Sequence, residues 1–427
     1  MDIALTTYRA AIDALFTRTT GVWKLGLERV SALLSLLGNP HKTLSVLHVA
    51  GTNGKGSVVA MADAILRARG LRVGRYTSPH LIDFRERVLV DGVPITEDEV
   101  LTFLGRWESA AERIGATFFE TTTALALDHF AKADVDVAVV EVGLGGRLDA
   151  TNVVDPRAAV VTSIALDHTE WLGDSIEEIA TEKGGIFKAA RPAVIGERNP
   201  SIVELLRRIA ESHEARPIAS ASDWGAITDV RVTTEGTSFV VDGATRSVMR
   251  TPLLGAHQAE NAVTALVALD AAGFGPWPAG GEQFSVPAVT LPGRFQWVGQ
   301  RIFDVAHNPT GAEVLADTIA AVAPTRPLVA LLSVLGDKDW RAIMVALARV
   351  VDEVVLTIAP SAPTERLWHL DDALMFARAL PWRVSADASF DTALSRADSS
   401  ASTLLITGSF HTVGDAMLRL QVNPLAR

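Results

Sequence analysis

The sequence contains no cysteine. This absence excludes disulfide bonds, zinc–thiolate sites and thiol nucleophiles. No stretch approaches the roughly 18 consecutive apolar residues of a membrane span. Residues 1–15 carry Asp2 ahead of any apolar run, which argues against a signal peptide. We therefore expect a cytoplasmic protein without a membrane partner.

Positive charge is also scarce. The 427 residues include 39 Lys and Arg against 50 Asp and Glu, for a formal net charge of -11. Because a nucleic-acid-binding surface is basic, no nucleic-acid partner is expected, whereas an anionic small molecule needs only a local basic pocket. The hydrophobic share of 48% is typical of globular proteins. The length exceeds the roughly 250–300 residues of one core, which predicts two domains.

Short apolar runs alternate with amphipathic stretches in the first part of the chain. Strands are predicted at residues 44–50, 135–140, 158–164 and 193–196, and helices at 57–69, 175–187 and 202–213. This alternation predicts a parallel sheet covered by helices on both faces. Residues 229–249 change to an alternating pattern with glycines at the turns, which predicts a small antiparallel hairpin on the first domain.

A second α/β series follows the Gly/Pro-rich residues 273–292, after a predicted helix at residues 256–272. Its strands are predicted at residues 302–306, 328–335, 354–358 and 403–407, and its helices at 312–321, 340–350 and 413–420. The fold class is therefore α/β, with two doubly wound domains. We place the first at residues 1–290, a linker at 291–299, and the second, smaller and Rossmann-like, at 300–427.

Residues 51–57, Gly-Thr-Asn-Gly-Lys-Gly-Ser, stand between a predicted strand and a predicted helix. Successive backbone N–H groups and the helix dipole make such a loop a cradle for phosphate oxygens. Lys55 is placed to reach the β- and γ-phosphates of a nucleotide, and Ser57 to face Mg²⁺. Gly56 separates these two residues, which departs from the usual P-loop pattern. We predict a phosphate site rather than a plain turn, and so a P-loop ATPase domain.

Polar residues end the neighbouring predicted strands. Glu141 stands at the carboxyl end of one strand, where it suits Mg²⁺. The alternative is an ion pair with Arg147, and the glycines that follow favour the ligand role. His168, after Asp167, follows the next strand. A lone histidine is weak evidence for a metal ligand, but its position on the same rim of the sheet as Glu141 strengthens that interpretation. Lys183 lies late in a helix, where a solvated cation is the simpler interpretation.

Three segments stand out in the second half of the chain. Residues 291–296 lie at the domain joint, residues 303–309 end a strand, and residues 405–411 lead from the last strand into a helix. Polar residues at strand ends of a second α/β domain suggest that it closes over the first. Taken alone, each segment is also compatible with ordinary turn chemistry.

In order along the chain, these segments resemble the folylpolyglutamate synthase/dihydrofolate synthase family, within the wider Mur-type ligases. The matching blocks are residues 24–29, 51–57, 77–81, 141–152, 167–168, 182–186, 257–261, 291–296, 304–309 and 408–411. They span nearly the whole chain, and their number and order make the match specific. Arg75 is a departure, since a small or apolar residue is expected there.

The resemblance implies a role for each matching position. ATP would be held by Gly51, Thr52, Asn53, Gly54, Lys55, Gly56, Ser57, Asn261, Arg294, Asp304 and His307. The magnesium ligands would be Ser78, Glu141 and His168, and Lys183 matches a lysine that the family carries as a carbamate. The folate or pterin would contact Leu27, His80, Arg85, Phe118, Phe119 and Asp149. Glutamate would bind at Ser409 and His411.

The implied activity is that of an acid–amino-acid ligase (ADP-forming) that uses ATP and Mg²⁺. It would add L-glutamate to dihydropteroate, to the glutamate tail of reduced folates, or to both, through an acyl phosphate. Asp149 favours the bifunctional form, and we expect a monomer with small-molecule substrates. Two alternatives stay open: another Mur-type ligase that builds peptidoglycan precursors, and a P-loop ATPase that acts on a protein partner.

Overall fold

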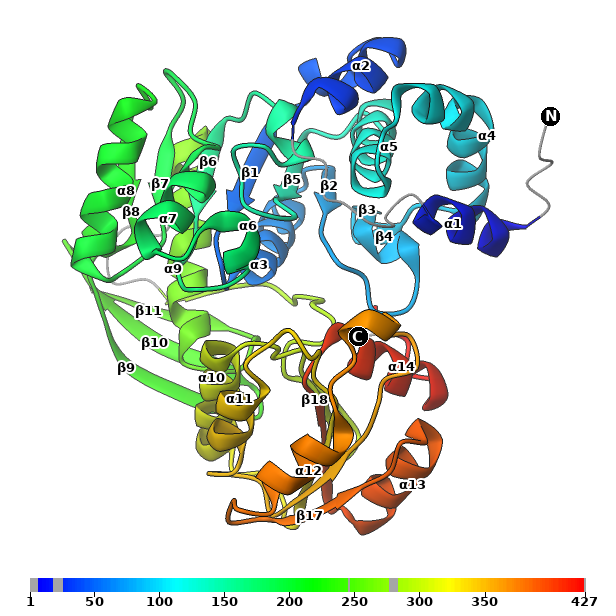
Figure 1. The fold of residues 1–427 in the computed structure, drawn as a ribbon. Coiled ribbons are helices and arrows are strands. Elements are labelled where there is room, and N and C mark those ends of the chain that lie inside the picture. Colours follow the sequence, from blue (N-terminus) through cyan, green and yellow to red (C-terminus); the bar gives the residue numbers. More distant parts are fainter. Residues whose placement is uncertain (1–6, 18–25, 245, 276–282, 426–427) are drawn as a thin grey trace.

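The computed structural model describes residues 7–17, 26–244, 246–275 and 283–425, and its strands form three sheets (Figure 1). Lys24 and Leu25 of the first matching block, and residues 276–282 of the Gly/Pro-rich stretch, fall outside the described residues. Over the residues that are described, we find no helix whose length and apolar character would suffice to span a bilayer.

The first sheet has eight strands in the order β4-β3-β2-β5-β1-β6-β7-β8. Six strands, β2, β5, β1, β6, β7 and β8, run parallel to one another. Strands β3 and β4 extend the sheet beyond β2 as antiparallel edge strands. Their bounds are β1 (Val46–Ala50), β2 (Val73–Tyr76), β3 (Val88–Val90), β4 (Val93–Pro94), β5 (Val137–Glu141), β6 (Ala158–Val161), β7 (Ala193–Ile195) and β8 (Ile218–Ser220).

Helices cover both faces of this sheet because neighbouring side chains of each strand point to opposite sides. Leu47 and Val49 of β1 pack with α3 (Lys55–Ala68) and α9 (His257–Leu269), whereas Val46 packs with α1, α2, α4 and α5. The remaining helices α6, α7 and α8 pack in one cluster with β6 and β7. The bounds are α1 (Tyr8–Phe16), α2 (Glu28–Leu36), α4 (Glu97–Ile114), α5 (Phe118–Lys132), α6 (Thr169–Leu172), α7 (Ile176–Gly184) and α8 (Pro200–Ser212).

The predicted hairpin at residues 229–249 is part of a larger sheet in the order β12-β11-β10-β9. Strands β9 (Ala226–Thr233), β10 (Gly236–Asp242) and β11 (Arg246–Thr251) are antiparallel, and β12 (Gln283–Ser285) pairs with β11 in parallel. The predicted hairpin therefore covers only part of this four-stranded sheet. A three-residue strand that is distant in sequence carries no periodic signal by which it could be recognised.

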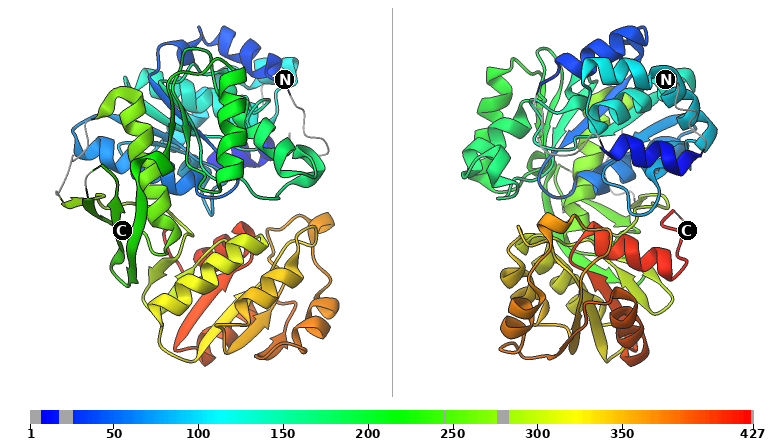
Figure 2. Two further views of the ribbon diagram at one scale, coloured as in Figure 1. Left: turned by 90° about the vertical axis from the view of Figure 1, so that its left-hand side faces the viewer. Right: turned by 45° about the vertical axis from the view of Figure 1, so that its right-hand side comes forward.

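The third sheet forms the core of the C-terminal part, in the order β13-β14-β18-β15-β16-β17 (Figure 2). Helices α10, α11 and α12 pack on one face, and α13 and α14 on the other. The bounds are β13 (Gln296–Val298), β14 (Arg301–Phe303), α10 (Pro309–Val322), β15 (Leu328–Leu332), α11 (Trp340–Leu347), β16 (Glu353–Leu356), α12 (Leu370–Ala377), β17 (Arg383–Ala386), α13 (Phe390–Ser400), β18 (Thr403–Thr407) and α14 (Phe410–Arg419).

Two doubly wound α/β units are thus confirmed, while the boundary at residues 291–299 stays a prediction. Within that range β13 already pairs with β14 of the third sheet. The carboxyl ends of β1, β2, β5 and β6 face the C-terminal unit, since Asp167 after β6 bonds Lys338 after β15. Ligands of open α/β sheets bind at such carboxyl ends. The fold therefore places the candidate site between the two units (Figures 1 and 2).

Candidate active site

The loop between β1 and α3 requires glycine at two positions. Gly51 has a φ of +145°, and a Cβ there would lie 1.9 Å from Thr162 Oγ1. Gly54 precedes α3 with a φ of +88°, and a Cβ there would lie 2.4 Å from Asn261 Oδ1. The Thr162 hydroxyl donates to Asn53 O at 2.7 Å and so ties the loop to the end of β6. The first turn of α3 leaves N–H groups without partners inside the helix, as anion binding requires.

Two lysines converge on one carbonyl oxygen of this loop. Lys55 Nζ donates to Gly51 O at 2.9 Å and to Thr52 O at 3.1 Å, and Lys183 Nζ donates to Gly51 O at 3.0 Å. Burial lowers the pKa of Lys55. Burial and the charge of Lys55 lower the pKa of Lys183 to about 7. The site therefore concentrates positive charge where a phosphate would relieve the repulsion.

Glu141 ends β5 beside this loop and is 5% exposed. Its Oε2 accepts a hydrogen bond from Ser78 N at 3.2 Å. Burial raises its pKa, although Lys55 and the Ser78 N–H act in the opposite direction. The alternative ion pair with Arg147 is wrong, because the Arg147 guanidinium lies 2.7 Å from Glu182 Oε1 instead. The carboxylate of Glu141 is therefore not paired with Arg147 and faces the phosphate loop.

Asp167 connects the two units. Its Oδ1 accepts from Lys338 Nζ at 3.0 Å and its Oδ2 from Asn308 Nδ2 at 3.3 Å, both from the C-terminal unit. His307 Nε2 lies 3.9 Å from Oδ2. Burial raises the pKa of Asp167, but His168, Lys338 and His307 outweigh burial and hold it well below its usual range. We name this contact, Asp167 with Lys338 and Asn308, the interdomain latch.

Ser78, Glu141 and His168 offer a hydroxyl, a carboxylate and an imidazole, a donor set that fits a hard cation. Burial lowers the pKa of His168 to about 4, so its ring is neutral and has a lone pair. His168 also adopts a left-handed backbone with a φ of +52°, a conformation that is uncommon outside glycine and often functional. Among the described residues no three His, Asp or Glu side chains form a metal site by themselves. Phosphate and water oxygens would therefore have to complete the coordination, as is usual for Mg²⁺.

The predicted nucleotide residues of the C-terminal unit lie close together. The Arg294 guanidinium lies 5.1 Å from the centroid of the Phe410 ring, and the His307 ring lies 5.9 Å from the same ring. Asp304 accepts from the N–H groups of Phe295 at 2.8 Å and Ala306 at 2.9 Å. Burial lowers the pKa of Arg294, which acts electrostatically on Glu141 across the interface. Arg294 also acts electrostatically on Lys55, so this group of residues faces the phosphate loop.

Arg75, the departure from the expected pattern, is 4% exposed on β2. Its Nη1 lies 3.4 Å from Asp63 Oδ2 and donates to Thr290 O at 3.1 Å. Burial lowers its pKa and Asp63 opposes this effect. Arg75 therefore ties α3 to the segment that leads into the C-terminal unit, which sequence reasoning did not foresee.

Aromatic residues line the side of the site formed by α1 and α5. Phe118 stacks on Phe16 with 4.4 Å between ring centroids, and His80 meets Phe16 edge-on at 5.8 Å. His80 Nδ1 accepts from Arg87 Nε at 2.7 Å, and the Arg87 guanidinium lies 5.1 Å from the Phe118 ring centroid. The sequence assigned His80 and Phe118 to the folate site, but it gave no sign of the pairing of Arg87 with His80, which no local pattern reveals.

The other predicted folate residues occupy different surroundings. Arg85 pairs with Asp83 at 2.7 Å. The Phe119 ring lies 6.1 Å from the Tyr76 ring, and Leu27 packs on the core at the start of α2. The predicted roles of these residues remain untested by their positions.

Asp149 is buried and accepts four hydrogen bonds. Oδ2 accepts from Gly143 N at 3.1 Å and Leu144 N at 2.9 Å, and Oδ1 accepts from both the N–H and the hydroxyl of Thr151. A carboxylate has about four acceptor sites, so all are occupied. Asp149 shapes the turn after β5, and a direct contact with a pterin would have to replace one of these bonds.

Ser409 and His411 open α14 at the far side of the interface. The Ser409 side chain caps the helix, accepting from Thr412 N at 3.1 Å, and is 3% exposed. His411 Nδ1 lies 3.0 Å from Ser361 Oγ. A Cβ on Gly414 would lie 2.2 Å from Leu81 O, so α14 abuts the loop that follows Ser78. Of the two predicted glutamate residues, His411 is the one whose side chain is not committed to a helix cap.

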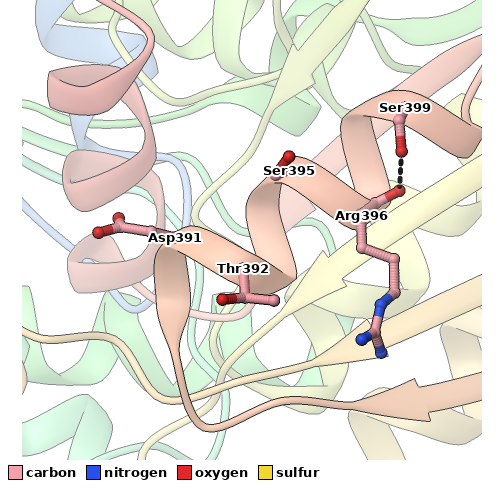
Figure 3. Close-up of a pocket in the computed structure, with 5 residues that line it drawn as sticks. All are labelled: Asp391, Thr392, Ser395, Arg396 and Ser399. Atoms are coloured by element: carbon pink, nitrogen blue, oxygen red, sulfur yellow. Dashed lines mark hydrogen bonds between the residues drawn. The ribbon is translucent and has the colours of Figure 1, made fainter.

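A shallow surface hollow along α13 is unrelated to this site (Figure 3). It is lined by Asp391, Thr392, Ser395, Arg396 and Ser399, all from one helix. The Ser399 hydroxyl donates to Arg396 O at 3.0 Å. None of the predicted site residues contributes to it.

Comparison with known proteins supports the arrangement of the two units. Residues 49–269 match the Mur ligase middle domain, and residues 293–410 match the Mur ligase glutamate ligase domain. The dihydrofolate synthase/folylpolyglutamate synthase of Escherichia coli K12 is 39% identical over 401 residues, which cover 92% of this chain and 90% of that protein.

Solved structures agree with this likeness. A Mycobacterium tuberculosis folylpolyglutamate synthase complexed with ADP superposes with a TM-score of 0.87 at 34% identity, covering 98% of this chain and 99% of that one. A bifunctional folylpolyglutamate synthase/dihydrofolate synthase with Mn, AMPPNP and L-glutamate bound gives a TM-score of 0.80 at 34% identity and covers 97% and 98% of the two chains.

Proposed function

The chain belongs to the dihydrofolate synthase/folylpolyglutamate synthase family of Mur ligases, and from that premise we propose that the residues around the loop 51–57 form its active site. The protein is an ATP-dependent ligase that joins glutamate to a folate-type acid, with a divalent metal ion. One observation carries the assignment of the site. Lys55 and Lys183 meet at the Gly51 carbonyl beside the buried carboxylate of Glu141.

We assign the triphosphate of ATP to the backbone of residues 51–57. Lys55 donates to carbonyl oxygens of the loop, and a phosphate would take over these donors. Asn261 faces the loop at Gly54, and Arg294, Asp304 and His307 approach from the C-terminal unit. The nucleotide would thus touch both units and favour their closure.

Ser78, Glu141 and His168 would hold Mg²⁺, which neutralises phosphate charge and polarises the reacting oxygen when it is bound. Lys183 is suited to the carbamate that its family position implies. Only a neutral amine attacks CO₂, with loss of one proton, and a pKa of about 7 keeps much of Lys183 neutral at physiological pH. The product is an anion in place of a cation beside the metal position.

A carboxylate has a poor leaving group, so it must be activated first. We propose that the carboxylate oxygen of the folate-type acid attacks the γ-phosphorus of ATP, ADP leaves, and an acyl phosphate results. Lys55 neutralises charge on the transferred group. The amine of glutamate then attacks the carbonyl carbon and phosphate departs. The interdomain latch keeps water away from the acyl phosphate during this interval.

We propose that the enzyme uses both dihydropteroate and reduced folates, as a bifunctional member. The test measures phosphate release with ATP, Mg²⁺ and glutamate, in parallel with dihydropteroate, a reduced folate monoglutamate and a UDP-muramyl substrate. Turnover with both pteroates supports the proposal. Turnover with one pteroate alone overturns the bifunctional assignment, and turnover only with the muramyl substrate supports a peptidoglycan ligase. ATP hydrolysis that is unaffected by glutamate and by every acid indicates the P-loop ATPase alternative.

We further propose a cytoplasmic monomer in which residues 1–290 bind ATP, residues 291–299 link the units and residues 300–427 receive glutamate. Its substrates and ATP are cytoplasmic metabolites, and a chain without cysteine is compatible with that compartment. Both units contribute site residues from one chain, so the site needs no second copy. Sedimentation of the purified protein tests the oligomeric state directly.

A further inference from the structure

Ser361, His411 and Asp415 form a side-chain relay at the start of α14. Ser361 Oγ lies 3.0 Å from Asp415 Oδ2 and 3.0 Å from His411 Nδ1, and Ser361 N donates to the same Oδ2 at 3.0 Å. Ser361 follows β16, while His411 and Asp415 lie on α14. The relay therefore joins two strand ends of the third sheet at the face turned toward the N-terminal unit.

The number of hydrogens available for these bonds determines the tautomer of His411. A carboxylate only accepts, so the single hydroxyl hydrogen of Ser361 goes to Asp415. The hydroxyl oxygen is then the acceptor toward the ring, and His411 Nδ1 carries the hydrogen. Nε2 consequently has the lone pair, and no side chain among the described residues bonds to it. The order carboxylate–serine–histidine also excludes a serine nucleophile, because the serine hydrogen faces the carboxylate and not the base.

His411 lies across the interface from the residues assigned to the reaction. Gly414, three residues further along α14, abuts Leu81 O, and His411 and His80 are close enough to influence each other electrostatically. The preceding residue Phe410 carries Arg294 against its ring. Two charged groups face His411: Asp415 on its own helix, and Arg366 from the segment before α12, which is paired with Asp337. His80 of the N-terminal unit is a further titratable group near His411, and burial keeps its ring neutral.

The reaction needs a base at this place. Glutamate arrives as an ammonium ion, which has no lone pair with which to attack the acyl phosphate. A neutral imidazole with a free Nε2 is a suitable acceptor for one of its protons. Burial lowers the pKa of His411, and the positive end of the α14 dipole also favours the neutral ring.

We infer that His411 is the general base that deprotonates the incoming glutamate, with Ser361 and Asp415 as positioning residues. This inference rests on the proposed function. His411 Nε2 takes one proton from the α-ammonium, the amine nitrogen forms a bond to the acyl carbon, and the carbon–oxygen bond to the phosphoryl group breaks. A second amine proton leaves with the phosphate, and the imidazolium returns its proton to solvent.

Hydroxylamine separates this step from the formation of the acyl phosphate. It is largely unprotonated at neutral pH, so it captures the acyl phosphate as a hydroxamate without a base. In His411→Gln we expect the kcat for glutamate to fall by about 10²-fold or more, while hydroxamate formation from dihydropteroate and ATP falls by no more than about threefold. The matched control is His369→Gln, an exposed histidine without a side-chain cap bond, which we expect to behave as wild type.

The pH profile supplies the second measurement. The wild-type kcat should fall on the acid side, below the 6.5 of an ordinary imidazole, as His411 becomes protonated. Asp415 raises the pKa of His411. Asp415→Asn should therefore move the acid limb to lower pH, whereas a merely structural role would lower the rate without moving it.

Four outcomes overturn the inference. They are an unchanged kcat for glutamate in His411→Gln, a rise in the KM for glutamate alone, an equal loss of both reactions, and an unmoved acid limb in Asp415→Asn. If wild-type protein forms neither amide nor hydroxamate from a pteroate, the proposed function itself is wrong.

Discussion

Lys55 and Lys183 donate to the same Gly51 carbonyl, so a protonated, unmodified Lys183 would repel Lys55. Lys183 is buried and Lys55 is partly buried, so water screens the repulsion between them only weakly. Glu141, Asp167 and Asp149 lie within electrostatic range and offset part of it. The proposed carbamate would remove the charge of Lys183, and the terminal phosphate of ATP would then supply the anion for Lys55 at the point where transfer occurs.

Replacing Lys55 tests this charge directly. Lys55→Met should keep the fold but lower kcat by about 10²–10³-fold, because the developing charge on the phosphoryl group loses one donor. Lys42→Met, at an exposed position, is the matched control. Glutamate-dependent phosphate release gives the rate, and circular dichroism in the far and near ultraviolet reports the fold. If the Lys55→Met enzyme had a normal rate, the assignment of the ATP phosphates to this loop would be wrong.

His48 makes stability depend on pH. It lies in β1 with no exposed surface, its Nε2 lies 2.8 Å from Thr151 Oγ1, and burial lowers its pKa to about 3. Between pH 6.5 and 3 the unfolded chain binds a proton at this residue and the folded chain does not, so stability falls as the pH drops through this range. At pH 5 the loss relative to pH 7 is about 2 kcal/mol for this group.

His48→Asn should therefore reduce the difference in the free energy of unfolding between pH 7 and pH 5. Asparagine does not titrate, and because its amide stands at the position of the ring's Nδ1, the bond to Thr151 is lost equally at both pH values. Urea denaturation at the two pH values measures the effect, with His369→Asn as the control at an exposed site. An equal pH dependence in wild type and His48→Asn would mean that His48 is already protonated or accessible in the fold.

Sequence reasoning reached the residues that lie in one continuous pattern and missed those that depend on distant partners. The loop 51–57 and Glu141 stood out because glycine and charge follow apolar runs. Lys338 belongs to an unremarkable Gly-Asp-Lys-Asp turn, and only the fold brings it to Asp167. Ser361 has no local signal at all, since its two partners are on α14.

At the scale of elements, the start of α3 contains two glycines with opposite requirements. Gly54 has a left-handed backbone and no room for a Cβ, whereas Gly56 lies in the helix, where a Cβ would be 3.6 Å from Leu291 Cδ1 and 3.8 Å from Glu141 Oε1. Gly54 is needed for the shape of the loop. Gly56 leaves space in front of Glu141.

Alanine should therefore separate stability from activity in this helix. Gly54→Ala should lower the free energy of unfolding by about 1–2 kcal/mol, whereas Gly56→Ala should raise it by up to about 1 kcal/mol because alanine favours a helix. Gly56→Ala should nevertheless raise the KM for ATP, since its methyl group enters the space beside Glu141. Denaturant midpoints and initial rates measure the two effects. A destabilised Gly56→Ala would contradict the ordinary van der Waals contacts expected of a Cβ at this helical position.

The elements that were predicted well are the buried ones with strong periodicity. The strand predicted at residues 403–407 coincides with β18, and residues 57–69 lie almost wholly within α3. Strand β2 was not predicted, because the buried Arg75 interrupts four residues that would otherwise read as apolar. Strands β12 and β13 have three residues each, too few for any period to show.

At the scale of the whole molecule, the interdomain latch couples closure to water exclusion. Lys338→Met should weaken closure and let water compete for the acyl phosphate. We expect the ratio of phosphate released to amide formed, near one in wild type, to rise by about two- to tenfold. Lys132→Met, at an exposed lysine of α5, is the control. An unchanged ratio with a lower rate would assign Lys338 to binding and not to closure.

Besides the interdomain latch, two further contacts lie where the two units meet. Helix α10 packs on β9, and Thr290 is held by Arg75, which itself rests on Asp63 of α3. If these two contacts persist when the latch opens, the C-terminal unit can move mainly by rotation about the line through them. Such a rotation would open the contact between Lys338 and Asp167 while α10 stays on β9 and Thr290 stays on Arg75.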